Sequence, residues 1–219
     1  MGDRDAKTAL FDQFARVGKA LGSGKRLELL DLLAQGERTV EALARAAELG
    51  VTTASAHLQT LKQANLVATR REGTKIHYRL AGTDVAALYA LTRTVAWAHL
   101  PDVEAASAAY LGPDDAEQVS RDELLRRAEK GEVMVLDVRP REEYQAGHIP
   151  GAVSVPVEEL ADKLGDIPAD QDVVAYCRGA YCVLAHDAVR LLAAHGRTAR
   201  RLADGMLEWR IAELPVETT

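Results

Sequence analysis

The sequence has little cysteine and no long apolar segment, and both shortages limit the class of protein. Its 219 residues include only two cysteines, which are too few for a disulfide framework. We therefore expect a cytoplasmic protein without a long-lived disulfide. No apolar run approaches the roughly 18–20 residues that a membrane span needs, and the N-terminus lacks the apolar core of a secretory signal. We expect no membrane partner.

Charge is unevenly distributed along the chain, although the net charge is only −6. Residues 1–100 carry a net charge of +4, and the remaining residues carry −10. Such a split indicates two modules with different partners. The basic half can face a polyanion, which the acidic half would repel.

Apolar residues at helical spacing dominate the first half of the chain. The pattern predicts helices within residues 9–21, 22–36, 40–50 and 54–66. Thr39 is the expected N-cap of the third helix, and Thr52 or Thr53 that of the fourth.

An alternating segment follows these helices. Residues 66–80 predict a β-hairpin that turns at residues 72–74. A long alanine-rich helix is then expected from about Thr83 to Tyr110. The segment LGPDD, residues 111–115, interrupts the helical pattern, and we place a domain boundary there.

The third and fourth helices are joined across the segment ELGVTTA with the spacing of a helix-turn-helix. Small polar side chains on the second of them suit a helix that enters the major groove of DNA. The residues expected to face DNA are Thr52, Thr53, Ser55, Ala56, His57, Gln59, Thr60 and Lys62. The basic hairpin residues expected to reach phosphates are Arg70, Arg71, Lys75 and Arg79. The alternative is a solvated helical bundle with a charged hairpin.

Three segments closely resemble, in the same order, those of the ArsR family of dimeric winged-helix repressors: ALGSGKRLELLDLLAQG, TTASAHLQTLKQA and VATRREGTKIHYRL. The resemblance runs over roughly residues 10–95 and implies a DNA-binding and dimerisation domain over residues 1–112. It makes the second segment the recognition helix, the third the wing, and the first and last helices the dimer interface. A homodimer of this kind implies an inverted-repeat operator in double-stranded DNA.

Metal-sensing members of that family carry cysteines in the helix that begins here with ERTVEALA. This sequence has Arg38, Thr39 and Glu41 there and no cysteine before Cys177, so we expect no soft-metal site in that helix. His99 is a lone histidine, which we interpret as a surface or packing residue. We expect neither a metal nor another cofactor.

Short apolar segments alternate with helical patterns in the second half. Strands are expected over residues 133–138, 152–157, 172–177 and 198–205, and helices over 120–131, 157–165 and 183–195. The alternation predicts an α/β domain with a mostly parallel sheet. The first and third strands are continuously apolar, which is typical of strands buried on both faces.

Both cysteines lie on one strand-to-helix turn, in the segment DVVAYCRGAYCVLAHDAV. Cys177 follows a buried strand, and ligands of parallel sheets bind beyond the strand ends. The next helix offers unpaired N–H groups and the positive end of its dipole, and Arg178 adds a cation. These features lower the pKa of a thiol and stabilise a bound anion. The alternative is a buried core residue at Cys177 and a small packing residue at Cys182.

The segments VMVLDVRPREEYQAGHIPGAVSVP, VVAYCRGAYC and LADGMLEWR resemble a rhodanese domain over about residues 117–212. The resemblance implies a rhodanese-like domain over residues 113–219. The cysteine of the rhodanese family holds sulfane sulfur as a persulfide, and Cys177 matches the position of that cysteine. The cradle comprises Gly179, Ala180 and Tyr181, together with Arg178 and Cys182. The residues that match architectural positions are Asp137, Arg139 and His148.

The loop departs from the family at Cys182, where an arginine commonly closes the cradle. Fast turnover of thiosulfate is therefore not expected, and Cys182 can instead attack a persulfide on Cys177. For the whole chain we predict two domains, one of the α+β class and one of the α/β class. We predict that the protein is a transcriptional regulator that senses or transfers sulfur from a small donor. The alternatives are a rhodanese-type sulfurtransferase with a DNA-binding domain for targeting or autoregulation, and an oxyanion reductase of the arsenate type.

Overall fold

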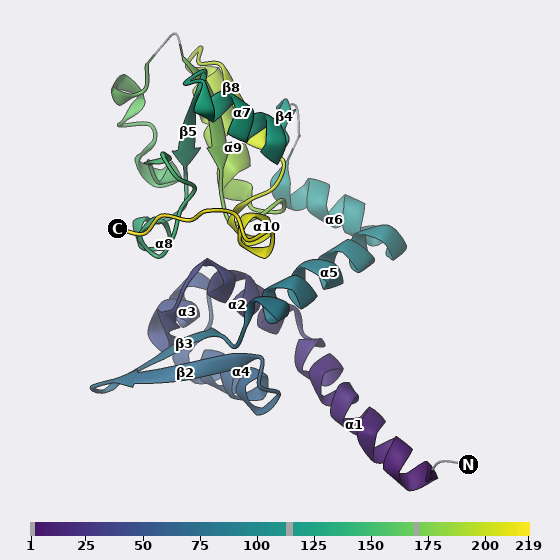
Figure 1. Cartoon of the computed structure of the whole chain (residues 1–219). Helices are drawn as coiled ribbons and strands as arrows, with labels where there is room; N and C mark the ends of the chain where they lie inside the picture. The colour runs from purple at the N-terminus through teal and green to yellow at the C-terminus, as the bar shows by residue number, and fades with distance from the viewer. Residues whose placement is uncertain (1–2, 113–115, 169–170) are drawn as a thin grey trace. The chain divides into compact units, whose positions relative to one another are not determined.

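The computed structural model describes residues 3–112, 116–168 and 171–219 (Figure 1). The chain divides into two compact units, Met1–Tyr89 and Ala90–Thr219. The domain boundary that the sequence predicts at residues 111–115 falls partly on residues 113–115, which lie outside the described residues. The position of that boundary stays a prediction.

The N-terminal unit combines helices with a small antiparallel sheet. Its elements are α1 (Arg4–Leu21), α2 (Gly24–Gln35), β1 (Arg38–Thr39), α3 (Val40–Ala46), α4 (Val51–Gln63), β2 (Val67–Glu72), β3 (Lys75–Leu80) and the first part of α5 (Thr83–His99). The strand order is β1-β3-β2. Strands β2 and β3 form the expected hairpin, in which Glu72 pairs with Lys75. Gly73 turns the chain with a φ of 58°, a conformation that glycine adopts without steric cost.

Leucine side chains from α2, α3 and α4 form the core of this unit. Leu29, Leu30, Leu43, Leu58 and Leu61 have no exposed surface. Buried leucines recur four positions apart on α2, at Leu29 and Leu33, and three apart on α4, at Leu58 and Leu61, so each helix buries one face. Other side chains of α4, such as Gln59 and Lys62, are exposed.

The sequence predicted the N-cap residue correctly for α3 but not for α4. The Thr39 hydroxyl accepts a hydrogen bond from the backbone N–H of Ala42, which confirms the predicted cap of α3. Helix α4 begins at Val51 and has Gly50 as its N-cap. The prediction that Thr52 or Thr53 caps it is wrong, since both lie inside its first turn.

The predicted helix from Thr83 to Tyr110 is two helices. Helix α5 ends at His99, and α6 (Asp102–Leu111) begins after Pro101. Proline lacks a backbone N–H and disfavours a helical conformation in the residue before it. The helix therefore breaks at Leu100 and Pro101.

The C-terminal unit contains a five-stranded sheet in which every described strand pairing is parallel. The strands are β4 (Gln118–Val119), β5 (Val133–Asp137), β6 (Val153–Ser154), β7 (Asp172–Tyr176) and β8 (Ala199–Leu202), in the order β4-β8-β7-β5-β6. The helices are α6, α7 (Arg121–Glu129), α8 (Arg141–Gln145), α9 (Val183–Ala194) and α10 (Met206–Ile211), besides the last part of α5. The mostly parallel α/β fold is thus confirmed.

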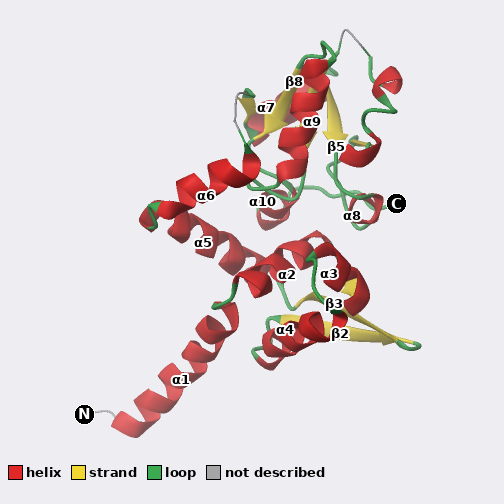
Figure 2. Cartoon of the chain, turned by 180° about the vertical axis from the view of Figure 1, so that it is seen from behind, coloured by secondary structure: helices red, strands yellow, loops and turns green. Residues whose placement is uncertain are grey.

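Helices cover both faces of this sheet, as Figures 1 and 2 show for α7 and α9. Val173 and Ala175 of β7 belong to the cluster that contains α9, whereas Val174 and Tyr176 belong to the cluster on the other face. This alternation explains why the strand is continuously apolar.

The prediction of a helix over residues 157–165 is wrong. That segment contains two short 3-10 helices, η1 (Val157–Glu159) and η2 (Leu164–Asp166). Leu160 between them is fully buried, so the segment packs its apolar side chains without a continuous helix. Among the described residues, we find no helix with the length and apolar character required to cross a membrane.

Candidate functional site

The cysteine loop, residues 177–182, connects β7 to α9 at the carboxyl end of the central strand. Cys177 is only 1% exposed, and Cys182 is the N-cap of α9. A disulfide joins the two, with Cα atoms 6.3 Å apart, a separation within the usual range for disulfides. The sequence predicted no long-lived disulfide, so the structure differs from the expected pair of free thiols.

The start of α10 holds the first half of this loop. The backbone N–H of Met206 donates to the carbonyl of Cys177, and that of Leu207 to the carbonyl of Arg178, both at 2.9 Å. Gly205 lies so close that a Cβ atom there would be 2.4 Å from the backbone nitrogen of Gly179. Glycine at position 205 is therefore required for the loop and α10 to pack together.

Arg178 is held by a buried carboxylate from another part of the chain. Its guanidinium donates to Glu143 at 2.6 Å, and the Glu143 side chain is 1% exposed. The sequence predicted Arg178 as a cation beside Cys177. The ion pair compensates that charge, so the attraction of Arg178 for an anionic donor is reduced.

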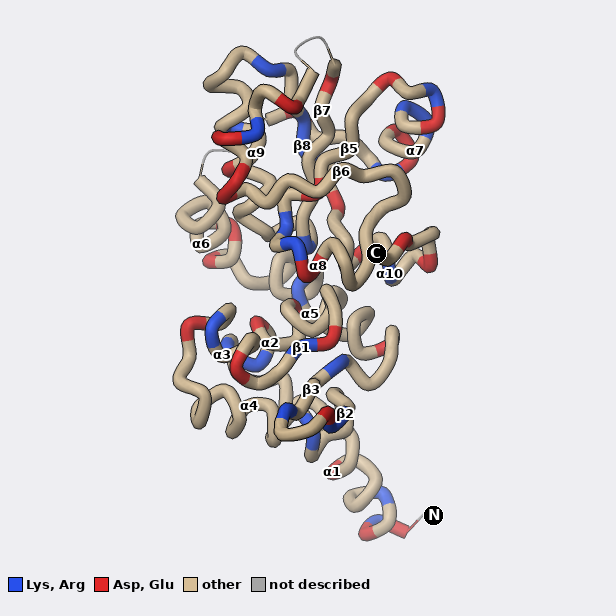
Figure 3. The backbone as a smooth tube through the Cα atoms, turned by 90° about the vertical axis from the view of Figure 1, so that its left-hand side faces the viewer, with Lys and Arg blue, Asp and Glu red and all other residues tan. Residues whose placement is uncertain are grey.

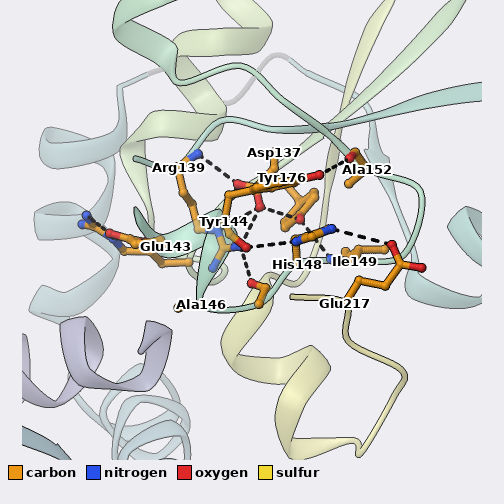
Figure 4. Close-up of polar contacts among 12 residues, drawn as sticks. Asp137, Arg139, Glu143, Tyr144, Ala146, His148, Ile149, Ala152, Tyr176 and Glu217 are labelled. Carbon is orange, nitrogen blue, oxygen red and sulfur yellow. Dashed lines mark hydrogen bonds and ion pairs between the residues drawn. The ribbon is translucent and has the colours of Figure 1, made fainter. Parts of the chain in front are cut away.

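A buried network fixes the strand ends beneath the loop (Figure 4). Asp137 and Arg139 form an ion pair at 2.6 Å, and neither side chain is exposed. The Tyr176 hydroxyl donates to Asp137 at 2.6 Å and accepts from the backbone N–H of Ile149 at 3.1 Å. Burial is the main reason why the pKa of Tyr176 is raised well above its usual value, so the hydroxyl keeps its proton.

His148 lies in the same region but belongs to a separate contact. Its ring stacks on Tyr144 with 3.7 Å between centroids, and its backbone pairs with Glu217 near the C-terminus. Its side chain is 3% exposed. Figure 4 shows it away from Arg178's partner Glu143 and directed toward Glu217.

Two of the remaining cradle residues, Gly179 and Tyr181, lie next to α5. Gly179 is buried, Ala180 is half-buried, and Tyr181 is 37% exposed. The Tyr181 ring contacts Trp97 and Arg93, which belong to the same compact unit. Cys177, Arg178 and Cys182 are thus assembled with all three predicted cradle residues.

A small pocket opens beside the loop at the carboxyl ends of β5, β6 and β7. Its volume is about 130 Å³. Its lining consists of Val138, Pro140, Pro156, Val157, Glu158, Arg178 and Leu184. The mostly apolar lining and the compensated Arg178 do not resemble a site for a small dianion.

The predicted DNA-facing residues lie on α4 and the hairpin. Thr52, Thr53, Ala56, Gln59 and Lys62 are exposed on α4, whereas Ser55, His57 and Thr60 are half-buried. The Gln59 amide donates to the Tyr78 hydroxyl at 2.9 Å, so this side chain has a hydrogen-bond partner within its own unit.

The four predicted basic residues of the hairpin are all exposed. Arg70, however, forms ion pairs with Glu37 at 2.6 Å and Glu72 at 2.8 Å. Figure 3 shows acidic and basic segments close together on this hairpin. The charge of Arg70 is therefore compensated by two carboxylates, which reduces its attraction for an anion.

Several residues of the site were not predicted from the sequence. Glu143, Glu208 and Arg93 are ordinary charged residues in helical patterns, and nothing local marks them as partners of a loop more than 25 residues away. The only available signal is the RPREEY segment, which places Glu143 shortly after the strand-end Arg139. Among the residues that the structure describes, no group of three or more His, Cys, Asp or Glu side chains could hold a metal ion.

Comparison with known families assigns the two units separately. Residues 23–69 match the family described as bacterial regulatory protein, arsR family. Residues 120–212 match the rhodanese-like domain. The chain therefore combines a winged helix-turn-helix DNA-binding unit with a rhodanese-like unit, which defines a class of transcriptional regulator.

The comparisons also find individual proteins that are similar to this chain. The HTH-type transcriptional regulator Rv0324 of Mycobacterium tuberculosis is 61% identical over 99% of this chain and 95% of its own length. A sulfurtransferase of Allochromatium vinosum is 30% identical over 47% of this chain and 91% of its own length. A Mycobacterium bovis fragment, described as a homodimeric winged helix-turn-helix DNA-binding domain, is 61% identical with a TM-score of 0.43, covering 46% of this chain and 93% of that one.

The chain belongs to the ArsR-family transcriptional regulators that carry a C-terminal rhodanese-like domain.

Proposed function

We propose that this regulator senses sulfane sulfur at Cys177 and captures it with Cys182, and that this chemistry changes its affinity for DNA. One observation carries the proposal: the two cysteines are bonded across a single loop at the carboxyl end of β7. A pair so close can exchange between dithiol and disulfide without movement of a domain.

The proposed chemistry has two balanced steps. The Cys177 thiolate forms a bond to the outer sulfur of an organic persulfide, the S–S bond of the donor breaks, and the donor leaves as a thiolate. The Cys182 thiolate then attacks Sγ of Cys177, and the outer sulfur leaves as hydrosulfide. The sulfane sulfur is reduced by two electrons, and the two thiolates are oxidised to the disulfide.

The surroundings of the loop favour sensing over rapid turnover. Arg178 is compensated by Glu143, and a cysteine replaces the arginine that commonly closes the cradle. Both features weaken attraction for an anionic donor such as thiosulfate. The pocket of about 130 Å³ beside the loop offers room for a small, less charged donor.

Mass spectrometry of the protein after treatment with a low-molecular-weight persulfide tests this chemistry. The reduced wild-type protein should release hydrosulfide and lose two hydrogen atoms in mass as the disulfide forms. The Cys182→Ser variant should instead retain one added sulfur, and Cys177→Ser should retain none. Retention of sulfur by Cys177→Ser would refute Cys177 as the acceptor.

The DNA-binding unit supports a dimeric regulator that recognises an inverted repeat. Helix α4 offers small polar residues, and Arg71, Lys75 and Arg79 remain exposed on the wing. Exposed apolar side chains lie on the two helices that form the dimer interface in this family: Leu10, Phe11 and Phe14 on α1, and Leu91 and Val95 on α5. Such exposure in a regulator is typical of an interface. The cytoplasm stays the predicted location.

A second candidate function is supported by the similarity of the C-terminal unit to a sulfurtransferase. In that case the sulfur on Cys177 would pass to an external thiol, and the DNA-binding unit would serve targeting or autoregulation. Repeated turnover with persulfide donor and excess acceptor thiol would favour this function. A single sulfur captured per polypeptide would favour the sensor.

A further inference from the structure

Helix α5 is shared between the two compact units. Val85 at its start is buried in the core of the N-terminal unit, and Tyr89 packs against the same core. The helix continues without interruption to His99, and its residues from Ala90 onward belong to the C-terminal unit. The end of this helix and the residues packed in the core of the DNA-binding unit therefore belong to one continuous element.

The second half of α5 contacts the cysteine loop through two side chains. The Arg93 guanidinium lies 4.7 Å from the centroid of the Tyr181 ring, and the Trp97 ring lies 5.6 Å from it. Arg93 and Trp97 are four residues apart and hence on one face of the helix. We call these two residues the Tyr181 clamp. The residue that they contact directly precedes Cys182.

Arg93 also reaches the other half of the loop. It forms an ion pair with Glu208 at 3.2 Å, and both side chains are mostly buried. Glu208 in turn accepts a hydrogen bond from the N–H of Gly205, at the start of α10. A Cβ atom on Gly179 would lie 3.3 Å from Arg93 and 3.2 Å from Glu208, so the loop backbone packs against this ion pair.

We propose that the Tyr181 clamp positions Cys182 for its bond with Cys177, and that the same contact couples the state of the cysteine pair to α5. The proposal rests on the proposed sulfur-sensing function. The clamp is intact in the bridged state that the structure describes. Because coupling between two sites is reciprocal, a bridge that favours the clamp must itself be favoured by the clamp.

The direct test is the equilibrium between the protein dithiol and glutathione disulfide. In this exchange the protein disulfide forms and two glutathione thiols are released. The full-length protein is equilibrated at fixed ratios of glutathione to its disulfide, trapped with an alkylating agent and weighed by mass spectrometry. Arg93→Ala and Trp97→Ala should each lower the equilibrium constant for the bridge by roughly fivefold or more.

Conservative variants separate positioning from general damage to the fold. Trp97→Phe and Tyr181→Phe keep an aromatic ring and should remain close to wild type. Arg93→Lys keeps the charge beside Glu208 but not the planar guanidinium on the ring, so an intermediate value is expected. Thr94→Ala, a change on another face of α5, is the matched control and should not shift the equilibrium.

A second arm measures the affinity for duplex DNA selected by the protein from a random pool, before and after persulfide treatment. Clamp variants should lose most of the wild-type response. An unchanged bridge equilibrium in both Arg93→Ala and Trp97→Ala would overturn the proposal. A shifted equilibrium with a full DNA response would overturn the coupling to α5 and leave the positioning role.

The two proposals fail in different ways. If the affinity of the wild-type protein for DNA does not change on sulfur loading, the sensing function is refuted. The bridge equilibrium then still decides whether the clamp positions Cys182. If wild type and the clamp variants respond alike with the same bridge equilibrium, only the clamp is refuted.

Discussion

Asp137 is the residue on which the buried network beneath the cysteine loop depends. It pairs with Arg139 and accepts from the Tyr176 hydroxyl, and all three side chains are inaccessible to solvent. The sequence segment LDVR placed two of them correctly at a strand end. It gave no sign of Tyr176, whose apolar neighbours in VVAYC suggest only a buried strand.

Replacing Asp137 should destabilise the C-terminal unit strongly. Asp137→Asn leaves the Arg139 charge buried without its counter-ion, which typically costs about 3–5 kcal/mol in free energy of unfolding. Both tryptophans, Trp97 and Trp209, lie in that unit, so urea unfolding followed by tryptophan fluorescence reports on it.

The matched control is Asp187→Asn, which breaks an exposed ion pair with Arg190. Exposed pairs contribute about 0–1 kcal/mol, so this variant should unfold close to the wild-type midpoint. Similar losses of stability in the two variants would contradict the role assigned to the buried pair.

The long-range partners of the loop show the limit of residue-scale prediction. Cys177, Cys182 and Arg178 were found because they share a short motif. Glu143 and Arg93 contact that motif from α8 and α5, and their sequence neighbours are those of any exposed helix. Only the fold brings their charges to the loop.

Among the elements, those with a strong apolar period were predicted and those set by tertiary packing were not. The hairpin and strands β5, β6, β7 and β8 were expected because alternation or a continuous apolar run marks them, although β6 has only two residues. The two-residue strands β1 and β4 carry no such pattern. Helices α8 and α10 contain five and six residues, which is too short for a helical period to emerge.

The wing is the element whose contribution to DNA binding is simplest to measure. Replacing Arg71 and Lys75 with alanine should weaken binding to all sequences, because phosphate contacts carry little sequence information. The slope of log affinity against log salt concentration should flatten by about one for each phosphate that the protein no longer neutralises.

Arg126→Ala with Lys130→Ala is the charge-matched control for the wing. These residues lie at α7 in the acidic unit and are more than half exposed. The control should keep the wild-type salt slope. If the wing variant also keeps it, the hairpin does not contact the DNA backbone.

At the scale of the whole molecule, the two units have different chemistry and one helix in common. The N-terminal unit contains no cysteine, and the C-terminal unit contains both. A signal that begins at the cysteines must therefore cross between units to alter DNA binding. A ligand that treats both states of the loop alike would shift nothing.

The most direct test of this account is DNA affinity measured on one sample whose sulfur content has been verified by mass. The wild-type protein, reduced and then treated with a low-molecular-weight persulfide, should change its affinity for a selected inverted-repeat duplex by roughly 5–150-fold, the range typical of allosteric coupling. Cys177→Ser should bind the same duplex with unchanged affinity before and after treatment. Equal wild-type affinity before and after verified formation of the Cys177–Cys182 bridge would contradict the account.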